Sequence, residues 1–221
     1  ILPLENIIYL GDTARVPYGT KSATTIERYA LQAGEALKKF HPKFMILACN
    51  TASAYGLDLL RSQCDFPVLG VIESGAKAAH IQGGPIAILG TRATVASHAY
   101  PRILHQLDAL LETFSLPCPL LVSLAEEGWW EDPITEAICL RYISDIPSHI
   151  KTVILGCTHY PALLPIFKRL RPDLIWVDSG TPLSHEVQDI LAQKVALNIS
   201  SKPGTLRLLV TDENSRLQEL A

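Results

Sequence analysis

The chain has 221 residues, a net charge of −3 and 48% hydrophobic residues, a composition typical of a folded protein with a well-filled core. Because no basic stripe accompanies this slightly acidic balance, we expect neither nucleic acid nor a membrane as a partner. No apolar run reaches the roughly 20 residues that a bilayer-spanning helix needs, and the first residues lack the pattern of a secretory signal.

Short apolar runs alternate with helix-length segments along the chain. The apolar runs predict strands at residues 7–10, 44–48, 68–71, 85–89, 120–124, 153–155, 174–177 and 206–210. Between them, helical spacing predicts helices at residues 22–40, 52–63, 93–111, 133–146, 161–170 and 183–194. Such alternation favours an α/β fold with mainly parallel strands, each covered on both faces. Turn signals stand at QGGP (82–85) and SSKPG (200–204).

A weak internal repeat relates the two halves of the chain. MILACNTASA (45–54) and VILGCTHYPA (153–162) share a strand pattern, a small residue, a cysteine and two polar residues. If the halves correspond, PIAILG (85–90) opens the second half, and its equivalent in the first half falls before residue 1. The repeat therefore predicts that one strand of the first half is missing from this sequence.

The five cysteines divide into two of functional interest and three with a structural interpretation. An odd number without a C-x-x-C pair argues against a disulfide framework and predicts a reducing, cytoplasmic location. Cys64, Cys118 and Cys139 are interpreted as small buried residues. Cys49 and Cys157 instead stand where a predicted strand gives way to a helix, and this is where open α/β sheets bind ligands.

The surroundings of these two cysteines predict a site for a small anion. The positive end of a helix dipole favours thiolate, so we expect a modest lowering of the thiol pKa from about 8.5 toward working pH. Asn50–Thr51 and Thr158–His159 follow the two cysteines directly and supply donors suited to a carboxylate. Two thiols on facing halves would suit inversion of a carbon stereocentre, where one base removes a proton and an acid returns one to the opposite face.

Seven stretches of the chain carry a resemblance to a known family. They are YLGDTARVPYGTK (9–21), ILACNTASA (46–54), PVLGVIESGAKAA (67–79), ILGTRATVASHAY (88–100), CPLLVSLAEEG (118–128), LGCTHYPALL (155–164) and VDSG (177–180). In this order they resemble the bacterial glutamate racemases of the cofactor-independent aspartate/glutamate racemase superfamily. The resemblance implies two pseudo-symmetric α/β lobes with mainly parallel sheets and glutamate in the cleft between them. It implies no metal and no cofactor.

The resemblance also assigns boundaries and roles. The first lobe would take residues 1–73 plus 180–221, and the second residues 74–179. The catalytic residues implied are the thiols Cys49 and Cys157, with Glu126 and His159 as auxiliary acid/base groups near the second thiol. The substrate-binding residues implied are Tyr18, Gly19, Asn50, Thr51, Thr91, Thr94, Thr158 and His159. The product, D-glutamate, would serve peptidoglycan synthesis, and association into a homodimer is left open.

One departure from the family keeps alternatives open. Family members begin with a strand that ends in D-S-G-x-G-G, whose aspartate assists the first thiol, and this motif is absent here. The later Asp178–Ser179–Gly180 is interpreted as a different element. The alternatives are a catalytically impaired or non-catalytic binding form of the racemase fold, and a racemase of another amino acid such as aspartate. Asp12 and Arg15 are interpreted as a local ion pair.

Overall fold

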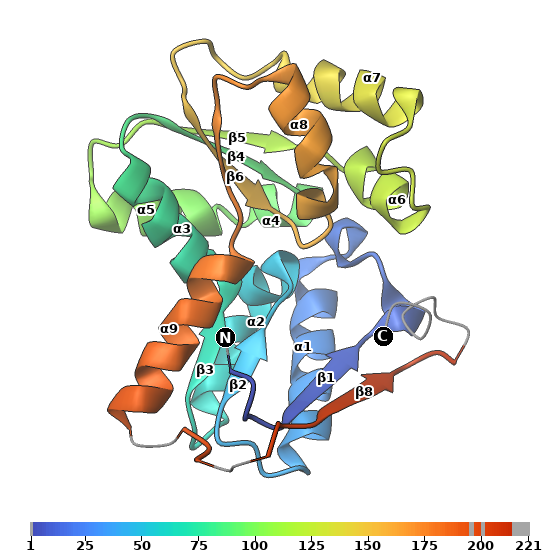
Figure 1. The fold of residues 1–221 in the computed structure, drawn as a ribbon, viewed down its shortest axis with the longest axis vertical. Coiled ribbons are helices and arrows are strands. Elements are labelled where there is room, and N and C mark those ends of the chain that lie inside the picture. Colours follow the sequence, from blue (N-terminus) through green and yellow to red (C-terminus); the bar gives the residue numbers. More distant parts are fainter. Residues whose placement is uncertain (1, 195–196, 200–201, 214–221) are drawn as a thin grey trace.

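The computed structural model describes residues 2–194, 197–199 and 202–213. Within these residues the strands form three parallel sheets, and Figure 1 shows them in two lobes, one above the other. The second lobe, drawn at the top, contains one sheet of four strands. The first lobe contains two sheets of two strands each. The predicted α/β class with parallel strands is therefore confirmed.

The four-stranded sheet has the order β5-β4-β6-β7. Its strands are β4 (Ile86–Gly90), β5 (Thr113–Pro117), β6 (Thr152–Gly156) and β7 (Ile175–Val177). Every residue of the central strands β4 and β6 is buried. Because successive side chains of a strand point to opposite faces, Ala87 and Leu89 belong to one hydrophobic cluster and Ile86 and Ile88 to another.

Helices cover both faces of this sheet. Figure 1 shows α6 (Leu120–Glu126), α7 (Pro133–Ile143) and α8 (Leu164–Leu170) on one side. On the other side lie α3 (Val71–Gln82) and α5 (Ala99–Leu107). The chain then returns to the first lobe through α9 (Gly180–Gln193), which packs against α3.

Besides α9, the first lobe contains two strand pairs and two long helices. β1 (Ile7–Gly11) pairs with β8 (Leu206–Val210), and β2 (Met45–Leu47) pairs with β3 (Val68–Gly70). The helices are α1 (Ala23–Lys38) and α2 (Asn50–Ser62), and the side chain of Ser22 caps the first turn of α1. In the second lobe β4 lies between β5 and β6 and pairs with both. The two strand pairs of the first lobe are separate sheets, and the further strand that the internal repeat indicates stays a prediction.

The predicted strand at 120–124 is wrong, because this segment forms helix α6. Leu121, Val122, Leu124 and Ala125 are buried, whereas Leu120 and Ser123 are exposed, which is helical spacing that the continuous apolar run LLVSL concealed. The strand of this region is β5, whose Pro117 occupies the edge of the sheet, where a missing N–H is tolerated.

Three further differences concern helices. Helix α3 was not among the predicted helices, because the apolar run before Ser74 and Gly75 resembles a strand. The helix predicted at 93–111 divides into α4 (Arg92–Ala96) and α5 at His98, whose φ of 53° is left-handed. The helix predicted at 161–170 begins instead as a 3₁₀ turn, Tyr160–Leu163.

The two predicted turns have different outcomes. The QGGP turn is confirmed, since Gly83 and Gly84 have φ values of 76° and 70°, a region that favours glycine. The SSKPG turn includes residues 200 and 201, which lie outside the described residues. Among the residues that are described, no helix is long and apolar enough to cross a bilayer.

The boundaries proposed for the lobes, at 73/74 and 179/180, stay predictions. Helix α3 runs through the first of these positions without a break. Its buried residues Val71, Ile72, Ala76 and Ala79 belong to a cluster that also draws in residues of α5 and α9.

Helices α1 and α2 approach closely because small residues face each other. A β-carbon added to Gly56 would lie 2.4 Å from the β-carbon of Ala30, and one added to Gly34 would lie 2.2 Å from Leu60 Cδ2. Leu60 ends in a flexible side chain that can move aside, but the methyl group of Ala30 cannot. Gly56 therefore sets the spacing between the two helices, and α2 is the helix that carries Asn50 and Thr51 at its first turn.

We expect Gly56→Ala to destabilise the protein by about 1–3 kcal/mol through overpacking against Ala30, although alanine by itself favours a helix. The double variant Gly56→Ala/Ala30→Gly should recover much of this loss, because it moves the methyl group to the other helix. Urea unfolding of the two variants measures both values. Gly180→Ala is the control, since its nearest contact would be an ordinary 3.5 Å from Asp178. Destabilisation that the double variant does not relieve would contradict this account of the helix spacing.

Candidate active site

Cys49 lies at the carboxyl end of β2 and caps helix α2. Its Sγ accepts a hydrogen bond of 3.5 Å from the backbone N–H of Ala52, and the side chain is partly exposed. The burial of Met45 and Leu47 fixes the strand, and the next residues, Asn50 and Thr51, are buried in turn. The expected junction of strand, cysteine and helix is therefore confirmed for Cys49.

Cys157 follows β6 and is 6% exposed. No α-helix begins directly after it; the chain makes a turn, then the 3₁₀ segment, and only then α8. Its Sγ lies 3.6 Å from Nδ1 of His159, and Nε2 of the same ring contacts the carboxylate of Glu126 at the end of α6. The structure thus brings Cys157, His159 and Glu126 into one chain of polar contacts.

Burial raises the pKa of both thiols. The pKa of Cys157 rises to about 12, because desolvation outweighs the hydrogen bond from the backbone of His159. The pKa of Cys49 is also raised by burial, against the hydrogen bonds at the start of α2. The expected lowering of the thiol pKa is therefore wrong, since desolvation raises the pKa by more than the hydrogen bonds to each sulfur lower it.

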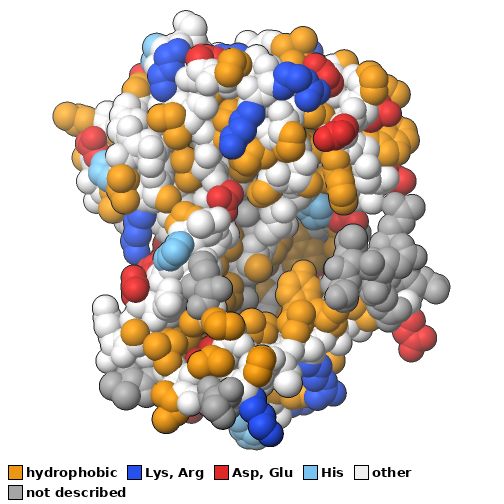
Figure 2. Space-filling view, in the orientation of Figure 1, with side chains coloured by type: hydrophobic (Ala, Val, Ile, Leu, Met, Phe, Trp, Pro, Cys, Tyr) orange, Lys and Arg blue, Asp and Glu red, His pale blue; other side chains and the backbone are white. Residues whose placement is uncertain are grey.

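The two sulfurs interact electrostatically. A negative charge on Cys49 raises the pKa of Cys157 further, so the two thiols lie close enough for one ionisation to oppose the other. This coupling favours a state with one thiolate and one thiol over a state with two thiolates. Figure 2 shows the surface hollowed between the two lobes.

Three threonine hydroxyls meet between the lobes. The Oγ1 atoms of Thr51, Thr91 and Thr94 lie 3.0 Å from one another in every pairing, and all three residues are buried. Gly19 packs directly on this cluster, since a β-carbon there would lie 2.4 Å from Thr91 Cβ. Four of the residues implied by the resemblance are thus brought together, and this contact has room only for glycine at position 19.

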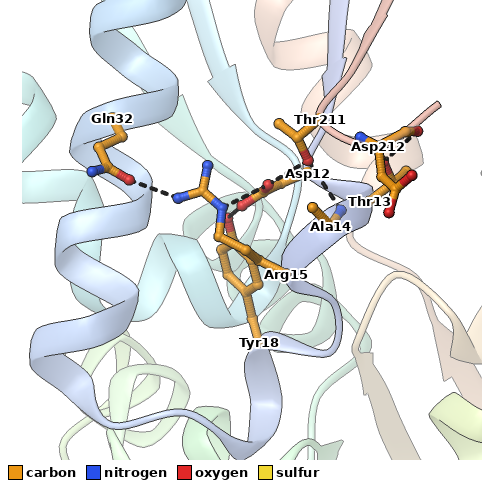
Figure 3. A network of polar contacts seen from close by, with 8 residues as sticks. All are labelled: Asp12, Thr13, Ala14, Arg15, Tyr18, Gln32, Thr211 and Asp212. Carbon is orange, nitrogen blue, oxygen red and sulfur yellow. Dashed lines mark hydrogen bonds and ion pairs between the residues drawn. The ribbon is translucent and has the colours of Figure 1, made fainter.

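Tyr18 belongs to a polar network around Asp12 (Figure 3). Its hydroxyl donates to the Asp12 carboxylate, which also accepts bonds of 2.9 Å from Arg15 Nε and 2.8 Å from the hydroxyl of Thr211. Burial, together with the bond to Asp12, raises the pKa of Tyr18. The predicted Asp12–Arg15 ion pair is confirmed. Because the proton of Tyr18 is committed to Asp12, this network orients the loop that leads to Gly19.

The predicted position Thr158 and the segment that begins at Asp178 lie at the edges of this arrangement. Thr158 is exposed beside Cys157, and its side chain makes no hydrogen bond to any residue that the structure describes. Asp178 Oδ1 accepts bonds of 2.9 and 2.8 Å from the backbone N–H groups of Gly180 and Thr181. Asp178 therefore caps the first turn of α9, and the interpretation of 178–180 as a different element from the family's opening motif stays a prediction.

Tyr100 and Ser179 are neighbours of the site that the sequence did not reveal. The Tyr100 hydroxyl donates to Oδ1 of Asn50 at 2.7 Å and lies 2.7 Å from the Ser179 hydroxyl. In the sequence, Tyr100 stood out only as the last residue of the family-like stretch ILGTRATVASHAY. His98 in the same stretch is exposed.

Among the described residues, no group of three or more His, Cys, Asp and Glu side chains could hold a metal ion.

Comparison with known proteins gives consistent results. The model of the family described as Asp/Glu/Hydantoin racemase matches residues 2–183. The glutamate racemase of Chlorobaculum tepidum is 40% identical over 224 residues, which is 99% of this chain and 82% of that protein.

Two solved structures are also similar. The glutamate racemase of Francisella tularensis in complex with D-glutamate has a TM-score of 0.94 at 34% identity. The match spans 99% of this chain and 83% of the Francisella chain. The glutamate racemase of Thermus thermophilus in complex with beta-chloro-D-alanine has a TM-score of 0.90 at 38% identity. The match spans 100% of this chain and 83% of the Thermus chain. With this likeness in sequence and fold, the chain belongs to the Asp/Glu/hydantoin racemase family, where it groups with the glutamate racemases.

Proposed function

We propose that this chain interconverts L- and D-glutamate without a cofactor by passing the α-proton between Cys49 and Cys157. The observation that carries the proposal is the pair of electrostatically coupled thiols, each at the carboxyl end of a parallel strand in a different lobe. The names of the relatives support glutamate as the substrate.

In the proposed reaction one sulfur enters as thiolate and the other as thiol. The thiolate takes the α-proton from one face of the substrate, and the thiol gives its own proton to the opposite face. The negative charge has then moved from one sulfur to the other, and the product is the other enantiomer. Buried donors near Asn50 and the threonine cluster would stabilise the charge that develops on the substrate carboxylate.

The raised thiol pKa suits this chemistry. The α-proton of an amino acid is a very weak acid, so a more basic thiolate transfers it with a smaller mismatch in pKa. Burial provides that basicity at Cys157, at the cost of a small thiolate population at neutral pH. His159, held by Glu126, is placed to exchange protons with the Cys157 sulfur.

By the same likeness, we propose that the reaction takes place in the cytoplasm and supplies D-glutamate for peptidoglycan. All five cysteines are free, which fits a reducing compartment. Association into a homodimer stays open.

Incubation with L-glutamate in D2O, without added cofactor, should replace the α-proton by deuterium and produce D-glutamate. Loss of the α-proton signal in NMR spectra measures the first event, and a chiral separation measures the second. L-aspartate is the parallel substrate and should exchange far more slowly. Faster exchange of aspartate would favour the other-substrate alternative. Exchange of neither, together with binding of D-glutamate, would favour the non-catalytic alternative.

Replacing either thiol should abolish racemisation. We expect Cys49→Ala and Cys157→Ala each to lower kcat by at least about 100-fold, the usual contribution of a general acid or base. Cys64→Ala is the matched control, because Cys64 is a partly buried thiol beyond the far end of α2 and should retain normal turnover. A single active-site variant with normal kcat would overturn the assignment of two bases.

The raised pKa of both thiols predicts a rising pH profile. A thiol with a raised pKa is protonated at neutral pH, and its thiolate fraction grows about tenfold per pH unit below the pKa. We expect log kcat/KM to rise with a slope near +1 from about pH 6.5 to 9, beyond the ordinary thiol pKa of about 8.5. Initial rates with both enantiomers measure the profile. A plateau that begins near pH 7 would show that the essential thiol has an ordinary or lowered pKa.

A further inference from the structure

Tyr100 is a fully buried tyrosine that contacts the chain beside both thiols. It belongs to α5 in the second lobe and is 1% exposed. A β-carbon added to Gly156 would lie 3.1 Å from Cε2 of the Tyr100 ring, so the ring packs on the backbone of the residue that precedes Cys157. The other end of the side chain, its hydroxyl, reaches Asn50, the residue that follows Cys49.

The hydroxyl of Tyr100 determines the orientation of the Asn50 amide. Since it donates its single proton to Asn50 Oδ1 at 2.7 Å, its second contact, 2.7 Å from Ser179 Oγ, is one in which Ser179 donates. Oδ1 of Asn50 is therefore occupied, and the opposite end of the amide, Nδ2, has no hydrogen-bond partner among the described residues. Asn50 is 3% exposed. Its Nδ2 is therefore a largely buried donor that is available to a ligand at the first turn of α2, beside Cys49.

Burial and nearby charge keep Tyr100 protonated. Burial raises its pKa, and negative charge on Cys157 and Asp178 raises it further. The hydroxyl therefore stays a donor while one thiol ionises, and the Asn50 amide keeps one orientation through the reaction.

We propose that Tyr100 is a positioning residue whose hydroxyl fixes the Asn50 amide so that Nδ2 donates to a carboxylate of the substrate. The inference rests on the proposed function and adds to it a residue that acts through another. The fixed amide donor would bind glutamate of either hand, because the carboxylate stays in place while the α-proton changes face.

Tyr100→Phe tests this role, because it removes the hydroxyl and keeps the ring against Gly156. We expect KM for both enantiomers to rise about 3- to 10-fold, as for loss of one oriented hydrogen bond, and kcat to change less than KM. Asn50→Ala should raise KM by a similar factor. The double variant should be no worse than Asn50→Ala alone, since the hydroxyl acts only through Asn50.

Tyr142→Phe is the matched control. Its hydroxyl accepts a bond of 3.5 Å from the backbone of Leu120 in the same lobe, and its loss should leave KM unchanged. If Tyr100→Phe lowers only the melting temperature, or if its effect on KM adds fully to that of Asn50→Ala, the positioning role is overturned.

A second measurement separates this proposal from the proposed function. Turnover of glutamate by the unmodified chain tests the function alone. In the 1H–15N spectrum, the side-chain amide of Asn50 is identified by its disappearance in Asn50→Ala. The proposal expects this resonance to shift and to exchange faster with solvent in Tyr100→Phe, whether or not the chain racemises glutamate. An unchanged resonance would overturn it. Should Tyr100→Phe not fold, Ser179→Ala, which removes the donor to Tyr100, should shift the same resonance.

Discussion

The buried contact between the threonine hydroxyls is the interaction on which the rest of the site depends. Thr51 comes from the first turn of α2 in the first lobe, and Thr91 and Thr94 come from the start of α4 in the second. Because the three buried hydroxyls lie 3.0 Å from one another, separating the lobes without water would break both contacts of Thr51 with the second lobe, at a cost in free energy. This contact places the carboxyl ends of β2 and β6, and hence Cys49 and Cys157, on the same interior space.

The close packing between the lobes also desolvates the two thiols. The packing around the thiols removes water fully from neither Cys49 nor Cys157, but it raises the pKa of both. Each thiolate is therefore a stronger base, but a smaller fraction of each thiol is ionised at neutral pH. Backbone N–H groups oppose this rise in pKa at both thiols. At Cys49 they belong to Thr51 and Ala52, and at Cys157 they belong to His159 and Tyr160. Cys157 also has the His159 ring 3.6 Å from its sulfur. The two thiols are therefore equivalent in chemistry but differ in their partners, so the two directions of proton transfer need not have equal barriers.

Much of the fold could be predicted from periodicity. The residues themselves pointed to Cys49, Cys157 and the polar residues that follow them, whereas the other candidate site residues came from the resemblance to a family. The strand at 206–210 and the cap at Ser22 agree with the structure because short-range pattern and turn chemistry decide them. Helix α6 was not predictable in this way, since LLVSL suits either a strand or a helix until tertiary burial decides. Tyr100 was missed because its role comes from contacts with residues 50 and 179, far away in the sequence.

The close packing of Gly75 against Ser179 has a consequence for the site. A β-carbon at Gly75 would lie 2.4 Å from Ser179 Oγ, so any larger residue at position 75 would push the Ser179 side chain aside. Ser179 contacts the hydroxyl of Tyr100, and that hydroxyl contacts Asn50. The absence of a single methyl group in α3 is thus linked, through two hydroxyl groups, to the orientation of a buried amide beside Cys49.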